Sequence, residues 1–335
     1  MMNKWRSKVN FGRYHSCSLG SNLLNFYNFK FSEAMAFGFG EGLYFRFYKN
    51  GEEWNIESYN LNLVDDLCAN LTFFVNHFVA YSPVELLNQI KENLYVKRYP
   101  FLIVFDVLAS NLDLVFGGQT NESQDSAELN IIFQKVLVYG YDPNDDSVII
   151  NNGISHFGKI SSRQFLNLFT EKGTPLGKIE WKIYIPPRRI VKTSYIIRQI
   201  LHRNSHCMLN LQGDRNSYFG VKGIEKFFNF IKSPETKPEE IKRLLVSMVS
   251  HETMNGYYRD LYADFLEEVN TKYKNDHVLP LIESYRQLAS LWKELFLNLY
   301  SHKFKKPQEA DEILMEEILR IELLNLKMLQ KISLI

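Results

Sequence analysis

The sequence contains few cysteines, no excess of charge and no long apolar run. Among its 335 residues, the only cysteines are Cys17, Cys68 and Cys207. They are too few and too far apart for a disulfide framework, and no Cys-X-X-Cys pair is available for zinc. Basic residues number 39 and acidic residues 38, so bulk electrostatics give no reason to expect a nucleic-acid partner. No run approaches the roughly 20 apolar residues that cross a bilayer. We therefore expect a cytoplasmic protein with no membrane partner.

The pattern of apolar residues changes at Pro186-Pro187-Arg188-Arg189, which interrupts regular structure and is polar enough for a linker. Apolar residues recur with the period of a helix in six segments after it: Ser194 to Leu209, Gly223 to Lys232, Pro238 to Val249, Tyr257 to Tyr273, Val278 to Tyr300 and Glu309 to Ile332. Before it, strand and helix patterns are mixed. We therefore predict an α+β fold class, with an α/β domain over residues 1–187 and an all-α domain over residues 188–335.

Within residues 1–187 the strongest signal is a hairpin. Ile131 to Tyr141 and Ser147 to Asn151 are apolar, and residues 142–146 between them form a dense cluster of turn residues. Strands are also predicted at Leu71 to Val79, Pro100 to Asp106 and Lys178 to Ile185, helices at Val84 to Asn93 and Ile160 to Thr170, and a polar loop at Gly117 to Glu128.

Cys17 opens a segment with the pattern of a helix. The apolar residues that follow recur at steps of three and four: Leu19, Leu23, Leu24, Phe26 and Tyr27. A cap by Ser16 or Ser18 would place Cys17 at the helix N-terminus, where the helix dipole stabilises the reactive thiolate. The alternative is a buried structural cysteine, because free cysteine is among the most buried residue types.

A turn of small residues, 32–42, follows this helix and leads into a strand predicted from Leu43 to Tyr48. Gly38 and Gly40 are candidates for an oxyanion or substrate contact, or else permit close backbone approach beside the cysteine helix. Glu33 could position a substrate amine or act as a helix cap. A nucleotide site is not expected, because the glycines lack a phosphate-binding lysine and do not connect a strand to a helix.

A cysteine nucleophile needs a base and a group that orients the base. The first hairpin strand offers Gln134 in place of a histidine, and Gln cannot accept a proton at neutral pH; the second strand leads to Asn152, a candidate orienting group. His15 and His156 are the nearest candidate bases, and for both the alternative is a surface or structural role. No metal site is predicted, since the only histidine pair with suitable spacing, His202 and His206, lacks a third ligand.

Several of these residues occur together in a known family. The order of His15-Ser16-Cys17, Asn22-Leu23-Leu24, Ser32-Glu33, the glycine-rich residues 37–42, the strand at 100–106 and the turn at 138–142 resembles the N-terminal domain of butirosin biosynthesis protein H. The helical half, marked by residues 256–268, resembles the domain of unknown function that often follows it.

This resemblance implies a papain-like fold and acyl transfer without a bound cofactor. Cys17 would take an acyl or aminoacyl group from the phosphopantetheine thioester of an acyl carrier protein, and a small-molecule amine would then attack the enzyme thioester, as in natural-product biosynthesis. His15 would carry the proton, with Asn152 and Gln134 as polar neighbours. Because the family has a histidine where this chain has Gln134, a non-catalytic papain-like binding protein is the alternative.

The last predicted helix, Glu309 to Ile332, has apolar residues around much of its circumference. Such a helix packs on its own domain or on a second subunit. We predict packing within the chain, with a homodimer through this helix as the second hypothesis.

Overall fold

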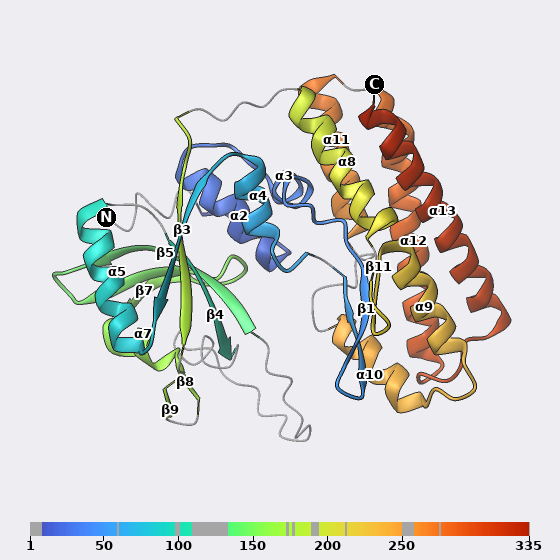
Figure 1. Cartoon of the computed structure of the whole chain (residues 1–335), viewed down its shortest axis with the longest axis horizontal. Helices are drawn as coiled ribbons and strands as arrows, with labels where there is room; N and C mark the ends of the chain where they lie inside the picture. Colours follow the sequence, from blue (N-terminus) through green and yellow to red (C-terminus); the bar gives the residue numbers. More distant parts are fainter. Residues whose placement is uncertain are drawn as a thin grey trace. The chain divides into compact units, whose positions relative to one another are not determined.

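The computed structural model describes residues 9–58, 60–97, 101–108, 133–171, 174–175, 178–188, 194–211, 213–249, 258–274 and 276–334. The chain forms two compact units, one of Met1–Glu33 with Leu71–Ile190 and the other of Ala34–Asn70 with Val191–Ile335 (Figure 1). The division at residue 190 is close to the predicted boundary at residue 187. The division at residue 33 has no counterpart in the prediction, which placed residues 34–70 with the N-terminal domain. The predicted loop at residues 117–128 lies outside the described residues.

The first unit contains a six-stranded sheet with the order β3-β10-β4-β5-β6-β7, in which every neighbouring pair is antiparallel. Its strands are β3 (Phe74–Ala80), β4 (Phe101–Leu108), β5 (Phe133–Asp142), β6 (Ser147–Asn151), β7 (Phe157–Ser161) and β10 (Ile179–Ile185); a separate short pair is formed by β8 (Thr170–Glu171) and β9 (Thr174–Pro175). The predicted hairpin is confirmed as β5 and β6, which pair from Leu137 opposite Asn151 to Asp142 opposite Ser147.

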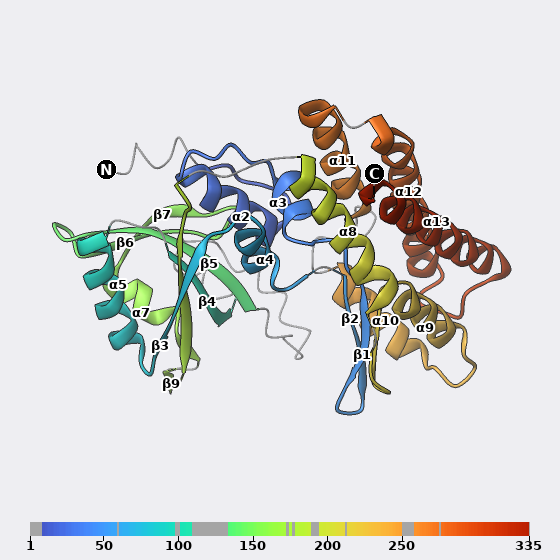
Figure 2. The ribbon, with the colours of Figure 1, turned by 45° about the horizontal axis from the view of Figure 1, so that its top comes forward.

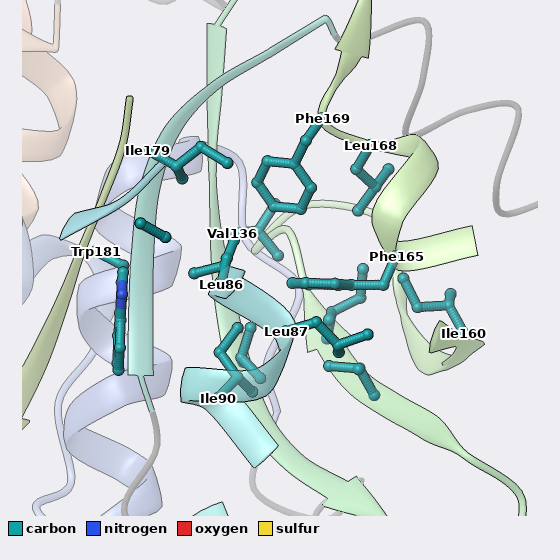
Figure 3. Close-up of a cluster of buried hydrophobic side chains, with 14 of the residues drawn as sticks. Leu86, Leu87, Ile90, Val136, Ile160, Phe165, Leu168, Phe169, Ile179 and Trp181 are labelled. Atoms are coloured by element: carbon teal, nitrogen blue, oxygen red, sulfur yellow. The ribbon is translucent and has the colours of Figure 1, made fainter. Parts of the chain in front are cut away.

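Strand β5 packs against helices through both of its faces, because successive side chains of a strand point to opposite sides. Val136 and Val138 belong to a buried cluster with Leu86 and other residues of α5 (Pro83–Lys97) and with Phe165 of α7 (Ser162–Asn167), which is drawn in Figure 3. Tyr139 instead contacts Phe26 of α2 (His15–Phe26), with ring centroids 5.6 Å apart. The sheet therefore separates α2 from the α5 core.

Local signals set the helix ends in this unit. Proline is favoured in the first turn of a helix, where its missing N–H is not needed, and α5 begins at Pro83. Helix α7 begins with a capping box, in which the Ser161 hydroxyl accepts the backbone N–H of Gln164 and the Gln164 side chain accepts that of Ser161. This serine is the local signal that fixes the start of α7 within the predicted helix at Ile160 to Thr170.

The second unit is largely helical, as predicted for the C-terminal half. Its elements are α3 (Glu33–Phe39, with Glu33 itself in the first unit), β1 (Arg46–Asn50), β2 (Glu53–Glu57), α4 (Leu63–Asn70), α8 (Ser194–Asn210), β11 (Ser217–Phe219), α9 (Gly220–Lys232), α10 (Pro238–Val249), α11 (Arg259–Tyr273), the 3-10 helix η1 (Asp276–Val278), α12 (Leu279–Ser301) and α13 (Glu309–Ser333). A small sheet has the order β11-β1-β2. Helix α13 packs against α8, α9 and α12, and α11 packs against α12 (Figure 2). The mixed α/β fold with a helical C-terminal region is confirmed at this level.

Residues 33–42 differ from the prediction of a glycine-rich loop followed by a strand from residue 43. Residues 33–39 form α3, and the strand begins only at Arg46. A Cβ atom at Gly38 would lie 2.3 Å from the Phe265 ring of α11, and one at Gly40 would lie 2.5 Å from the backbone oxygen of Leu63 in α4. The glycines therefore permit close packing within the second unit, not beside the cysteine helix.

Helix α13 buries one face within its unit and exposes another. Its buried apolar residues are Met315, Ile318, Ile321, Leu326, Leu329 and Ile332. Ile313, Leu324 and Met328 are exposed. Packing within the chain is confirmed, and dimerisation through the exposed face stays a prediction. None of the helices in the described part of the chain combines the length and apolar composition that a membrane span requires.

We predict that Gly38→Ala destabilises the second unit. The added methyl group would overlap the Phe265 ring, and such overpacking costs about 1–3 kcal/mol in most cores, more than the gain from alanine's higher helix propensity. Urea unfolding should show a lower midpoint. The matched control is Gly140→Ala, whose Cβ would meet its nearest neighbour, Ile149, at an ordinary 3.7 Å. An unchanged midpoint for Gly38→Ala would contradict the packing role.

Candidate functional site

Cys17 lies in the first turn of α2. The helix begins at His15, and the first bond of the helical ladder runs from the Ser18 N–H to the Tyr14 carbonyl at 2.8 Å. Tyr14 is the N-cap, with extended backbone angles and no capping side chain. The prediction that Ser16 or Ser18 caps the helix is therefore wrong, but Cys17 is still its third residue. The helix dipole and the first-turn N–H groups favour negative charge at such a position.

The carboxylate of Glu33 holds the residues that precede α2. It accepts the backbone N–H groups of Arg13 and Tyr14, each at 3.0 Å, and also the hydroxyl of Ser18. Glu33 is far from these residues in sequence, so it replaces the missing local cap. Two roles were predicted for Glu33, a helix cap or a contact to a substrate amine. Its three accepted hydrogen bonds support the cap, and they leave fewer lone pairs of the carboxylate for an amine.

Two glycines bring the turn after β6 against the start of α2. Gly12 donates its N–H to the Gly153 carbonyl at 3.2 Å. A Cβ at Gly12 would lie 2.0 Å from the Glu33 carboxylate, and one at Gly153, whose φ is +83°, would lie 3.1 Å from the His15 carbonyl oxygen. Both positions thus require glycine, and Gly153 directly follows Asn152. Asn152 is therefore next in sequence to a residue, Gly153, that contacts the first turn of α2, where His15 and Cys17 lie.

The side chain of Asn152 organises this turn. Its Oδ1 accepts the backbone N–H groups of Ile154, Ser155 and His156 at 3.2, 3.1 and 2.9 Å. Its Nδ2 lies 3.2 Å from Nδ1 of His156, and the Ser155 hydroxyl lies 2.7 Å from the same nitrogen. Asn152 and His156, both candidates from the sequence, therefore form one hydrogen-bonded unit.

The Asn152 amide presents its Nδ2 group to the His156 ring. Backbone donors occupy the Asn152 Oδ1, so it is Nδ2 that lies against Nδ1 of His156. An asparagine that orients a catalytic base accepts from the ring instead. Asn152 is thus a turn-forming residue here, and its predicted orienting role lacks the expected geometry.

His15 is the first residue of α2 and contacts β5, and its Nε2 atom is buried. Burial lowers the pKa of His15 from 6.5 to about 4, although a hydrogen bond to the backbone of Lys135 in β5 opposes the effect. The imidazole is therefore neutral at pH 7. A neutral imidazole with this pKa is a weak base, but it can still exchange a proton within the site.

The three cysteines lie in different environments. Cys17 is 2% exposed, and Cys68 in α4 is fully buried. Cys207 in α8 is half-buried, and desolvation together with the nearby Glu41 carboxylate raises the pKa of its thiol to about 12. Cys207 is therefore an inert thiol at physiological pH. Cys17 is so little exposed that a small reagent or substrate must displace neighbouring atoms to reach it.

The predicted site residues thus divide into two groups. His15, Cys17, Glu33 and Asn152 lie together in the first unit, and Gln134 lies in β5, opposite Val107 of β4. Gly38 and Gly40 belong to the second unit. Sequence reasoning missed Gly12 and Gly153 and named Ser18 only as a possible cap; the roles of all three depend on contacts between distant segments. The described residues include no group of three or more His, Cys, Asp or Glu side chains placed to hold a metal ion.

Comparison with known families gives one match. Residues 170–323 are similar to a domain of unknown function, DUF4872. No curated protein is significantly similar to the chain. The match covers most of the helices of the second unit and does not reach Cys17, so it carries no information on the chemistry of the first unit.

We predict that His15 makes the stability of the first unit depend on pH. Its pKa is about 4 in the folded state and 6.5 in the unfolded state, so the unfolded chain binds the proton first as the pH falls. Stability is then complete above pH 6.5 and declines by up to about 3 kcal/mol as the pH falls to 4. Urea unfolding at several pH values measures this slope, and NMR titration measures the pKa. His15→Gln should lose that part of the slope; an unchanged slope would contradict the assignment.

We also predict that Glu33→Ala destabilises the start of α2. The change leaves the N–H groups of Arg13 and Tyr14 and the Ser18 hydroxyl without their acceptor, which should cost about 1–3 kcal/mol. Hydrogen exchange should accelerate at residues 13–18. The control is Glu180→Ala, which removes an exposed surface ion pair with Lys178 and should change little. Equal exchange in both variants would show that Glu33 does not hold this segment.

Proposed function

We propose that the first unit is a cysteine-dependent acyltransferase with Cys17 as its nucleophile. The observation that carries this proposal is the placement of Cys17 in the first turn of α2, packed against β5, beside the turn that contains Asn152 and His156. The resemblance to the N-terminal domain of butirosin biosynthesis protein H supports a papain-like arrangement of this helix and hairpin. It also suggests the donor, an acyl carrier protein, and the acceptor, a small-molecule amine.

The reaction has two steps. The Cys17 sulfur attacks the thioester carbonyl of the phosphopantetheine arm, the bond to the pantetheine sulfur breaks, and that sulfur leaves as a thiol with the proton from Cys17. The amine then attacks the Cys17 thioester, loses a proton and releases the Cys17 thiol. Both steps exchange a sulfur leaving group, which needs less base catalysis than amide hydrolysis because thiols are much stronger acids than amines.

His15 is the histidine we assign to proton transfer, because it is two residues before Cys17; residues two apart on a helix do not face each other, so direct proton exchange with the thiol requires a rearrangement at the start of α2. First-turn N–H groups of α2 would stabilise the oxyanion. Glu33 and Asn152 hold the segments around the thiol. We leave Gln134, Gly38 and Gly40 out of the site. A free thiol nucleophile suits the reducing cytoplasm.

A non-catalytic binding protein is the second candidate, and three observations favour it. Cys17 is nearly inaccessible, the low pKa of His15 makes it a weak base, and the Asn152 amide faces His156 with its donor. Such a protein would keep the papain-like helix and hairpin and bind the acyl carrier or its cargo without turnover. A second copy bound through Leu324 and Met328 of α13 is compatible with either function.

The two candidates predict different reactivity of Cys17. For the acyltransferase, we expect iodoacetamide to label Cys17 at pH 6 well above Cys68 and Cys207 in the same sample, since a helix N-terminus lowers a thiol pKa. Peptide mass spectrometry measures all three cysteines at once, and Cys207 is the internal control for an inert thiol. Incubation with acyl-pantetheine thioesters should then leave an acyl group on Cys17, and Cys17→Ala should abolish it.

Labelling of Cys17 only near the ordinary thiol pKa of about 8.5, with no trapped acyl group, would exclude the acyltransferase. Retention of carrier-protein binding in that case would identify the binding protein. Hydrolysis of unmodified peptides by the purified chain would show instead that the site is a protease.

A further inference from the structure

The helical unit contains a buried polar cluster far from its surface. Arg259 and Tyr262 of α11, Tyr285 of α12, and Glu322 and Asn325 of α13 are each at most 2% exposed. Polar groups buried this completely are costly unless each finds a hydrogen-bond partner. The cluster takes no part in the proposed acyl transfer.

Helical spacing and direct contacts bring these side chains together. Arg259 and Tyr262 are three residues apart on α11, and Glu322 and Asn325 are three residues apart on α13, so each pair lies on one helix face. The Arg259 guanidinium donates to the Glu322 carboxylate, with Nε 3.5 Å from Oε2 and a second bond from Nη2 to Oε1. The rings of Tyr262 and Tyr285 meet at 4.9 Å between centroids. Three helices therefore converge on one polar region.

Three donors in this region have no partner among the residues that the structure describes. They are the hydroxyl groups of Tyr262 and Tyr285 and the Nδ2 group of Asn325. The Oδ1 atom of Asn325 accepts the Ser284 hydroxyl at 2.7 Å, and the Nδ2 group on the other side of the amide is the one without a partner. Arg259 and Glu322 neutralise each other. The region thus offers hydrogen-bond donors without net charge.

We propose that the second unit binds a small neutral hydrogen-bond acceptor between α11, α12 and α13, held by Tyr262, Tyr285 and Asn325. A bound oxygen with three protein partners has the coordination typical of an internal water. The carbonyl or hydroxyl oxygen of a small organic molecule has the same chemistry. An anion or cation is disfavoured, because the Arg259–Glu322 pair leaves no charge to balance.

The Tyr262→Phe and Tyr285→Phe variants of the full chain test this site through the sign of their effect. If both hydroxyls donate to a bound oxygen, each variant should melt about 2–4 °C lower, and the double variant should lose less than the sum. If the hydroxyls have no partner, removing them relieves a desolvation cost, and both variants should melt at or above the parent temperature. That result would overturn the proposal. Tyr300→Phe, whose side chain is exposed, is the control.

Refolding separates the two sources of the oxygen. A water returns when the chain is refolded from guanidinium in dialysed buffer, so the parent melting temperature should recover fully. A bound organic molecule would be lost, and the refolded parent would then melt at or below the temperature of the variants. Native mass spectrometry of protein that was never unfolded should show the added mass. A crystal structure of the full chain should show the oxygen about 3 Å from both hydroxyls; a protein atom in that place would overturn the proposal.

Discussion

The arrangement around Cys17 depends on the carboxylate of Glu33. Helix α2 begins without a capping side chain, and Glu33 supplies the acceptor for two backbone N–H groups before it and for the Ser18 hydroxyl within it. A negative charge near a helix N-terminus stabilises the helix, but it also competes with a thiolate at the same end. The carboxylate that positions Cys17 therefore also opposes negative charge on its sulfur.

Most elements follow from local signals, which is why the sequence predicts them. The turn residues 142–146 fix the register of β5 and β6, and Pro83 and Ser161 mark the starts of α5 and α7. In the second unit, α10 has the predicted bounds, Pro238–Val249, because its proline opens the helix. In each case, the information lies within a few residues of the element that it defines.

The misassigned features depend on contacts between distant segments. Gly38 is spaced from Gly40 as in a ligand-binding loop, yet its neighbour is the ring of Phe265, more than two hundred positions later. Helix α3 was not predicted because Gly38, its one glycine, has low helix propensity, but the same residue permits this close approach. Glu33 caps a helix that ends before it in sequence, a relation that no local pattern indicates. The candidate site was therefore predictable as a list of residues near Cys17, but not as a geometry.

That geometry also sets what a papain-like site could do here. In the usual arrangement, an asparagine accepts from the histidine ring and steadies a protonated base. In this chain, three backbone donors occupy the Asn152 Oδ1, so the Nδ2 group faces His156 and the amide offers the ring no acceptor. His15 is kept neutral by burial. His15 is thus unsuited to hold a proton as an imidazolium near the thiol, and Asn152 offers no acceptor to the His156 ring. Acyl transfer by Cys17 would then have to pass the thiol proton directly to the leaving group. A thioester donor allows this because its leaving group is a sulfur, whereas the amine that leaves an amide needs a separate proton donor.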